Sequence, residues 1–312
     1  MPYLFVHFRE KTTPDGEQVY FGISRDGFHW EPVNGGAPVL WSYLGERGVR
    51  DCAIARCRDG KFRILATDLS LSYRYHREGR LDWPKIGRTG SKSLVCWESE
   101  DLVEWSAQRL LPLGGPDFGC LWAPDLLYDP QQGDYLIHWS STHRDTPYMG
   151  IWCCRTKDFE TFTEPVPLYH APNCDVIDSA IYEEDGVYHL FLKNGADPEK
   201  IVLLKAHRAQ GPYARVAAFD ESMAAVEAGL YEGPTAARLP DGRWCLMLDF
   251  YGARGSGQGY VPFLGSLSLG RFSRADRDFS FPYGYKHGSI LDIGEDEYLR
   301  VKAHDFSDKG YP

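Results

Sequence analysis

The sequence predicts an all-β fold built from repeated antiparallel sheets, and three features support this prediction. A strand, a Gly-containing turn and a second strand recur along the chain; this is the pattern of a β-hairpin, because Gly supplies the positive φ that tight turns need. Aromatic residues make up 14% of the 312 residues, and 32 Gly and 20 Pro accompany them, as expected of a turn-rich β protein. The sequence shows no long amphipathic helical pattern.

Four of the hairpins begin with an acidic residue. They cover residues 51–66, 125–139, 178–191 and 232–248, and their leading acids are Asp51, Asp125, Asp178 and Glu232. Residues 3–23 form a fifth, partial copy that has no leading acid. If the first strands of such units surround one axis, the acids converge at one mouth.

A turn that contains an acid follows each hairpin, and an aromatic residue lies three or four positions later. Segments 24–30, 98–105 and 156–162 show this pattern clearly, and segments 206–213 and 276–280 show it in degenerate form. The acid of such a turn is expected to bond the backbone. We therefore expect sheets of three or four strands. Five of them around an axis make a five-bladed β-propeller, which leaves only short edges, and we expect residues 1–312 to form one such domain.

Two segments outside the hairpins also carry predictions. Residues 71–92 are polar and contain two Gly and a Trp-Pro pair, so they are expected to form a long loop, and long loops on a rigid β scaffold often carry function. Residues 217–230 are expected to hold one or two helical turns.

Composition limits the partners and the compartment. The net charge of −10 argues against a nucleic-acid partner, whose phosphates need a basic surface. No apolar run is long enough to span a membrane, and residues 1–7 lack the charged and apolar regions of a signal peptide. Several of the eight cysteines lie in apolar strands without zinc-type spacing. We expect a reduced, cytoplasmic setting; a leader removed from the chain is the alternative.

The converging acids suggest a chemistry. Carboxylates crowded into a partly dry site repel one another, so that some have raised pKa values and an acid and a base coexist near neutral pH. Hydrolysis of a glycosidic bond needs that division: one protonated carboxyl group for the leaving oxygen and one carboxylate to activate water. A single acid at a strand start more often caps a turn or faces water, but four such acids beside apolar or aromatic segments favour a functional site.

The motifs that carry these acids resemble those of glycoside hydrolase family 43, a family of five-bladed propeller enzymes that act with inversion. The resemblance covers nearly the whole chain and rests on an ordered set of motifs: Val49-Arg50-Asp51, Trp122-Ala123-Pro124-Asp125, Ile177-Asp178-Ser179, Glu232-Gly233-Pro234 and Lys286-His287-Gly288-Ser289. The family usually has Pro after the base and often after the third carboxylate, where this chain has Cys52 and Ser179.

The resemblance implies a role for each matching residue. Asp51 is expected to be the general base that activates water, and Glu232 the general acid. Asp178 is expected to be the third carboxylate, which orients the acid and raises its pKa. Asp125 is not one of the family's three acids and is expected to bond backbone. His287 matches a position that faces a cation or water in the family, so it is a candidate for a central Ca²⁺ or Na⁺ site. The alternative is a structural histidine, and the chemistry requires no cofactor.

Further residues are expected to contact the substrate, because aromatic rings stack on sugars and polar groups orient them. These are Arg50, Trp122, Ser179, Tyr251, Arg254 and Gln258. The last two lie in the Gly-rich segment 251–260, which lacks the Lys-Ser/Thr ending of a phosphate loop. Lys193 is expected to be either a surface residue or an ion-pair partner of the acids.

Together these observations predict an inverting exo-glycosidase that removes a terminal pentofuranose, α-L-arabinofuranose in the first instance, from an oligosaccharide. Three alternatives stay open. The same fold could act on a β-xyloside or a galactofuranoside. A glycoside phosphorylase would need a basic phosphate pocket near the base, with Arg50 and Arg254 as candidates. A non-catalytic binding module would leave the acids scattered or exposed. The oligomeric state is not indicated.

Overall fold

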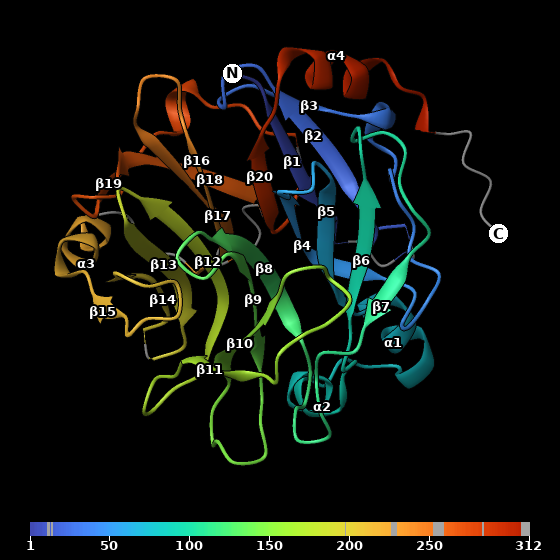
Figure 1. The fold of residues 1–312 in the computed structure, drawn as a ribbon, viewed down its shortest axis with the longest axis vertical. Coiled ribbons are helices and arrows are strands. Elements are labelled where there is room, and N and C mark those ends of the chain that lie inside the picture. Colours follow the sequence, from blue (N-terminus) through green and yellow to red (C-terminus); the bar gives the residue numbers. More distant parts are fainter. Residues whose placement is uncertain are drawn as a thin grey trace.

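The computed structural model describes residues 1–10, 13, 15–196, 198–225, 230–251, 259–282 and 284–306. These residues form mainly β-strands, and the strands are grouped in antiparallel units around a common centre (Figure 1). The prediction of a mostly β fold built from small sheets is therefore confirmed.

Three units are separate four-stranded sheets whose strands follow one another in chain order. The first contains β8 (Trp122–Asp129), β9 (Asp134–Ser141), β10 (Gly150–Thr156) and β11 (Val166–Tyr169). The second contains β12 (Val176–Glu184), β13 (Val187–Asn194), β14 (Lys200–Ala206) and β15 (Ala214–Arg215). The third contains β16 (Tyr231–Arg238), β17 (Trp244–Phe250), β18 (Gly259–Ser266) and β19 (Arg271–Arg274).

The remaining strands form an eight-stranded sheet that consists of two four-stranded halves. One half contains β4 (Val49–Arg56), β5 (Phe62–Asp68), β6 (Leu94–Ser99) and β7 (Arg109–Leu111). The other contains β20 (Gly288–Asp292), β1 (Tyr3–His7), β2 (Tyr20–Ser24) and β3 (Trp30–Pro32). A single parallel pair, Gly288 opposite Cys52, joins β20 to β4.

The place of β20 corrects the interpretation of residues 3–23 as a copy without its leading acid. β1 is not the first strand of its unit, because β20 pairs with it in antiparallel register from Tyr3–Asp292 to His7–Gly288. The C-terminal part of the chain thus supplies the first strand of the N-terminal unit. A short repeat cannot show this in the sequence, because the two strands are separated by almost the whole chain.

The first strands of the five four-stranded units contact one another in a closed cycle. β4 contacts β8, β8 contacts β12, β12 contacts β16, β16 contacts β20, and β20 contacts β4. Figure 1 shows these strands nearest the centre, with the later strands of each unit farther out. Residues at corresponding positions of these strands therefore lie around one centre.

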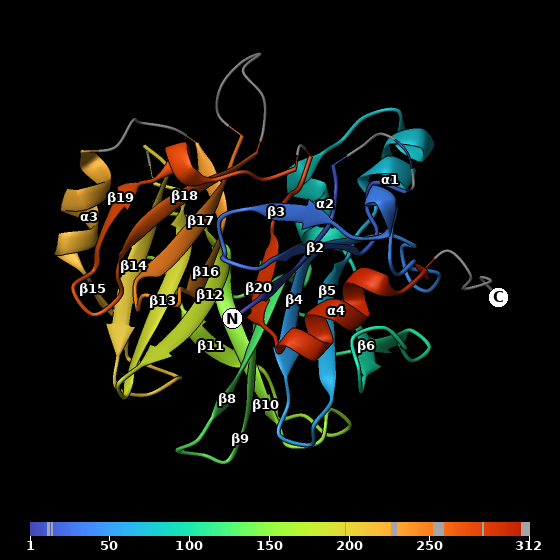
Figure 2. The same cartoon turned by 90° about the horizontal axis from the view of Figure 1, so that it is seen from above.

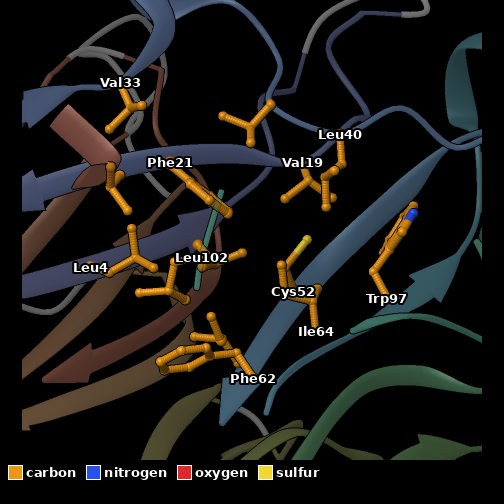
Figure 3. Close-up of a cluster of buried hydrophobic side chains, with 14 of the residues drawn as sticks. Leu4, Val19, Phe21, Val33, Leu40, Cys52, Phe62, Ile64, Trp97 and Leu102 are labelled. Atoms are coloured by element: carbon orange, nitrogen blue, oxygen red, sulfur yellow. The ribbon is translucent and has the colours of Figure 1, made fainter. Parts of the chain in front are cut away.

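The hydrophobic core lies between neighbouring units rather than in one central block. One cluster joins side chains of β1 and β2, such as Leu4 and Phe21, to side chains of β4, β5 and β6, such as Cys52, Ile64 and Trp97 (Figure 3). Similar clusters fill the spaces between the other units. This packing fixes each unit against the next and so fixes where the first strands begin.

The expected acid-containing turns are confirmed in the three clear copies. The Asp26 carboxylate accepts hydrogen bonds from the backbone of Phe28 and His29, each at 2.8 Å. The carboxylates of Asp101 and Asp158 likewise accept hydrogen bonds from the amides of the residues two and three positions later. These turns fix the direction in which the chain enters the outer strand of its unit.

The prediction that residues 71–92 form a loop is wrong, since the segment contains α1 (Leu71–Glu78) and α2 (Trp83–Thr89). Each helix begins at a capping side chain: Ser70 accepts a hydrogen bond from the amide of Tyr73, and Asp82 accepts one from Lys85. α3 (Ala217–Ala224) lies where helical turns were expected, and α4 (Glu295–Ala303) was not expected. Figure 2 shows α1 and α2 at the end of the sheets opposite the β8–β9 hairpin tip.

All eight cysteines are buried free thiols. Within the described ranges, no helix is both long and apolar enough to cross a membrane.

Candidate active site

Four first strands share a β-bulge at the same place. The pairing of each strand with its neighbour skips two residues, between Arg50 and Ala53, Trp122 and Asp125, Ile177 and Ala180, and Glu232 and Thr235. The first skipped residue always has a left-handed φ: 52° at Asp51, 47° at Ala123, 56° at Asp178 and 55° at Gly233. A bulge re-aims side chains and increases the local twist, so this repeated geometry places four residues around the centre.

The bulges correct the expectation that the four acids occupy equivalent positions. Asp51 and Asp178 are equivalent, but the residues at their position in β8 and β16 are Ala123 and Gly233. Glu232 lies one residue earlier, at the position of Arg50 and Trp122, and Asp125 lies two residues later. At Gly233 the missing side chain leaves room for the ring of His287.

Side chains of the second strands tie this ring together. Thr67 Oγ1 accepts a hydrogen bond from the Ala123 amide at 2.8 Å, and Ser140 Oγ accepts one from the Asp178 amide at 3.0 Å. The Asp249 carboxylate accepts one from the amide of His287 at 3.4 Å, just before β20. His287 is therefore the counterpart, in the unit of β20, of the bulge residues in the other units.

Asp51 lies between a hydroxyl group and an imidazole. Thr67 Oγ1 donates to its Oδ2 at 2.9 Å, and His287 Nδ1 lies 3.0 Å from its Oδ1. Burial acts to raise the pKa of Asp51, but the charge and hydrogen bond of His287, with Arg50 and Thr67, bring the pKa below its ordinary value. Asp51 is therefore a carboxylate at neutral pH.

His287 interacts with all three expected catalytic acids. Burial acts to lower its pKa, but the charges of Asp51, Asp178 and Glu232 raise it to about 9, so its ring is an imidazolium at neutral pH. Gly233 allows this ring to approach: a Cβ atom at that position would lie 2.5 Å from His287 Cγ, and the φ of 55° is itself one that Gly adopts without cost.

Asp178 bonds the backbone of the strand that carries Glu232. Its Oδ2 accepts a hydrogen bond from the Gly233 amide at 3.2 Å. At three other junctions a second-strand side chain accepts the equivalent bond, but here that residue is Lys193, which has no acceptor. Burial, partly offset by His287 and reinforced by Glu232 and Asp51, raises the pKa of Asp178 to about 6.

Glu232 lies between two lysines from different units. Lys193 Nζ is 3.5 Å from its Oε2, and Lys286 Nζ is 3.9 Å from its Oε1. Lys286 also pairs with Asp249 at 2.7 Å, and Lys193 contacts the Tyr251 hydroxyl group. Of the two expectations for Lys193, the structure shows the ion-pair partner.

The residues that were expected to contact the substrate differ in how accessible their side chains are. The guanidinium group of Arg50 is buried against Glu17 at 3.0 Å, and Ser179 Oγ lies 2.7 Å from His138 Nδ1, so both side chains are held within the protein. Tyr251 and Trp122 are half-buried, and the Tyr251 hydroxyl group bonds Glu199. Arg254 and Gln258, which were also expected to contact the substrate, lie outside the described residues.

Asp125 bonds backbone, and does so across two units. Its Oδ1 accepts a hydrogen bond from the Leu126 amide at 2.8 Å, and its Oδ2 accepts one from Ile181 at 3.4 Å in the neighbouring sheet. Burial raises its pKa to about 7.

The Nδ1 atom of His287 is not available to a Ca²⁺ or Na⁺ ion. Such cations take oxygen ligands, whereas the Nδ1 of His287 is engaged with Asp51 in an ion pair. In the described part of the chain, no group of three or more His, Cys, Asp or Glu side chains is arranged to hold a metal ion.

Sequence reasoning missed several residues of this site. Thr67 bonds Asp51. Lys286 lies beside Glu232 and forms an ion pair with Asp249. Each of these contacts exists only in the folded chain. Their one signal was position, because Thr67 and Asp249 lie one residue before the end of a second strand, opposite Arg50 and Glu232. The acids themselves gather around one imidazolium and are neither scattered nor fully exposed, unlike the arrangement that a non-catalytic module predicts.

Comparisons with known proteins agree with this arrangement. Residues 1–299 match the model of a family described as a probable glycosyl hydrolase domain, related to glycosyl hydrolase family 43. A curated α-L-arabinofuranosidase of Bifidobacterium longum subsp. longum is 27% identical over 208 residues, which is 59% of this chain and 19% of that protein. The chain thus spans about a fifth of the length of this relative.

Solved structures show the same fold at low identity. A xylan β-1,4-xylosidase of Bacillus halodurans superposes with a TM-score of 0.58 at 15% identity, over 89% of this chain and 53% of that one. An exo-1,5-α-L-arabinanase from a bovine ruminal metagenomic library superposes with a TM-score of 0.56 at 16% identity, over 84% and 88%.

Proposed function

The chain belongs to the family of probable glycosyl hydrolase domains related to family 43, and on this premise we propose that it is an inverting exo-glycosidase that releases terminal α-L-arabinofuranose from an oligosaccharide. The observation that carries the proposal is the convergence of Asp51, Asp178 and Glu232. Asp51 pairs with His287, the His287 ring lies against Gly233, and Asp178 bonds the Gly233 amide next to Glu232. Two carboxyl groups with different environments are what glycoside hydrolysis needs.

We also infer that the domain is a five-bladed β-propeller. The support is the cycle of contacts among β4, β8, β12, β16 and β20, each the first strand of a four-stranded unit. The parallel pair between β20 and β4 then lies between two neighbouring blades. The proposed site occupies the centre, where all five blades begin.

Asp51 is the proposed general base. It is ionised at neutral pH, and His287 and Thr67 fix both of its oxygens in place. Water held by this carboxylate attacks the anomeric carbon while its proton moves to Asp51. The bond to the leaving oxygen breaks from the opposite side, which inverts the configuration.

Glu232 is the proposed general acid, which gives its proton to the leaving oxygen. Lys193 Nζ and Lys286 Nζ, from the units on either side, lie 3.5 Å and 3.9 Å from its two oxygens. Asp178 is the proposed orienting carboxylate, because it bonds the amide of Gly233 next to the acid. No step of this mechanism passes through a metal ion, and the expected central Ca²⁺ or Na⁺ stays a prediction.

The choice of arabinofuranose rests on the related arabinofuranosidase and the structurally similar arabinanase. The structurally similar xylosidase makes a terminal β-xyloside the second candidate. A panel of nitrophenyl glycosides that includes α-L-arabinofuranoside, β-D-xyloside and β-D-galactofuranoside separates these sugars. The same panel with and without inorganic phosphate tests the phosphorylase alternative, which requires activity that depends on phosphate.

Replacing the proposed acid tests the assignment. Glu232→Gln should lower kcat/KM on an unactivated arabino-oligosaccharide by about 10²- to 10⁴-fold, because the leaving sugar needs a proton. The loss on a nitrophenyl arabinofuranoside should be much smaller, because nitrophenolate leaves without protonation. Glu221→Gln, at an exposed acid of α3, is the matched control. Equal losses on both substrates would contradict the role of Glu232 as the acid.

A further inference from the structure

A large hollow lies beside the proposed catalytic site. Its volume is about 820 Å³, and it is lined by α2, by residues of the segments 116–119 and 142–149, and by Trp122 and Asp175. Binding sites for small molecules usually have volumes of roughly 300–1,000 Å³, so this hollow has room for a ligand of about two to four sugar rings.

Trp122 connects the hollow to the catalytic ring. It pairs with Ser140 in the same register in which Glu232 pairs with Asp249, so Trp122 and Glu232 occupy equivalent positions in two units. Asp175, on the far wall, directly precedes β12, the strand that carries Asp178. Trp122 therefore belongs both to the catalytic ring and to the wall of the hollow.

The wall formed by α2 is fixed by hydrogen bonds. Thr142 Oγ1 donates to the carbonyl oxygen of Gly87 at 2.6 Å, and the amide of Gly90 donates to Gly119 at 2.8 Å. The amide of Gly119 in turn donates to Thr142 at 2.8 Å. This network holds α2 against both loop segments, so the hollow is formed before any ligand arrives.

The opposite wall is fixed in the same way. The Asp175 carboxylate accepts a hydrogen bond from the Met149 amide at 2.8 Å, and Arg144 forms an ion pair with Asp117 at 2.7 Å across the rim. The lining carries the guanidinium groups of Arg88 and Arg144 and the carboxylates of Asp117 and Asp175, so these side chains leave neither sign of charge in excess. Such a lining suits a neutral ligand.

Aromatic rings give the hollow its chemical character. Trp83 and Tyr148 line it while 47% and 37% exposed, and the half-buried Trp122 meets Trp83 edge-on with ring centroids 6.1 Å apart. Exposed rings beside paired polar groups are suited to sugars, whose apolar faces stack on aromatic rings while their hydroxyl groups form hydrogen bonds.

We propose that this hollow binds the leaving-group side of the substrate, as a neutral chain of several sugar units. The inference rests on the proposed function, because it extends the same site beyond the sugar that is cleaved. Trp122 separates the two parts, and Trp83 and Tyr148 contact the more distant sugars.

The test compares Trp83→Ala and Tyr148→Ala with the wild type on a nitrophenyl monosaccharide and on oligosaccharides of three to five units. The arabino-oligosaccharide series serves, or the xylo-oligosaccharide series if the nitrophenyl panel selects xylose. For each variant we compare kcat/KM on the oligosaccharide with kcat/KM on the nitrophenyl substrate. The ratio of the first to the second should fall by about three- to tenfold, the factor that corresponds to the free energy of one aromatic contact. Tyr75→Ala, at an exposed ring of α1 outside the hollow, should leave the ratio unchanged.

The outcomes separate this inference from the proposed function. A ratio that stays unchanged in both variants, with unaltered melting temperatures, overturns the inference while hydrolysis stands. If the wild type hydrolyses no substrate, titration calorimetry with the same oligosaccharides decides. Binding that weakens in Trp83→Ala and Tyr148→Ala supports the hollow and refutes the hydrolase. Binding that is absent, or equal in all variants, overturns the inference.

Discussion

At the scale of single residues, the site depends on the positive charge of His287, which acts on three carboxyl groups. The imidazolium of His287 faces Asp51 directly, and the charges of Asp178 and Glu232 also act on it. His287 keeps Asp51 ionised, while Asp178, whose carboxylate accepts a hydrogen bond from the Gly233 amide, has a pKa raised to about 6 by its burial. Asp51 and Asp178 occupy equivalent positions in the fold, but their surroundings shift their pKa values in opposite directions.

Replacing His287 should change the pH dependence of the reaction. His287→Gln removes the charge that does most to lower the pKa of Asp51, so the acidic limb of the kcat/KM profile should move to higher pH. The measurement is kcat/KM on a nitrophenyl glycoside over the stable pH range, with His207→Gln, at an exposed histidine, as the control. An acidic limb that stays in place would show that Asp51 does not depend on His287.

The same substitution has a consequence for stability. Because the pKa of His287 is raised from 6.5 to about 9 by folding, its contribution is complete below pH 6.5 and is lost as the pH rises through about 9. The difference in melting temperature between the wild type and His287→Gln should therefore shrink over that window.

At the scale of elements, the bulges and the acid-containing turns are the repeated devices of the fold. The turns could be predicted from the sequence because their contacts are local: Asp101 bonds residues only two and three positions later. The bulges could not, because an extra residue in a strand has no signature in a pattern of apolar positions. This is why the acids at 125 and 232 were aligned with Asp51, although the structure places them at other positions of the bulge.

One turn provides a direct test of this device. Asp101→Ala removes the acceptor for the amides of Val103 and Glu104, which should lower the free energy of unfolding by about 1 kcal/mol, as with the loss of a helix cap. Asp101→Asn retains a carbonyl oxygen and should lose less. Chemical denaturation measures both, with the neighbouring exposed Glu100→Ala as control. Equal stability of Asp101→Ala and Glu100→Ala would mean that the turn does not need this carboxylate.

At the scale of the whole molecule, the C-terminal strand completes both the fold and the site. β20 pairs with β1 and β4, and His287 and Lys286 directly precede it. The motif that contains them could be recognised in the sequence, but its contacts with Asp51, Asp249 and Glu232 follow only from closure of the ring. The acids were predictable one by one, whereas the charges that control them come from residues far away along the chain.

The configuration of the first sugar released tests the central claim most directly. Proton NMR at early times, before the product equilibrates, should show β-arabinofuranose released from an α-L-arabinofuranoside, because water activated by Asp51 attacks from the side opposite the leaving group. An initial product with the α configuration would contradict the account, since it would require a carboxylate of this site to act as a nucleophile rather than as a base.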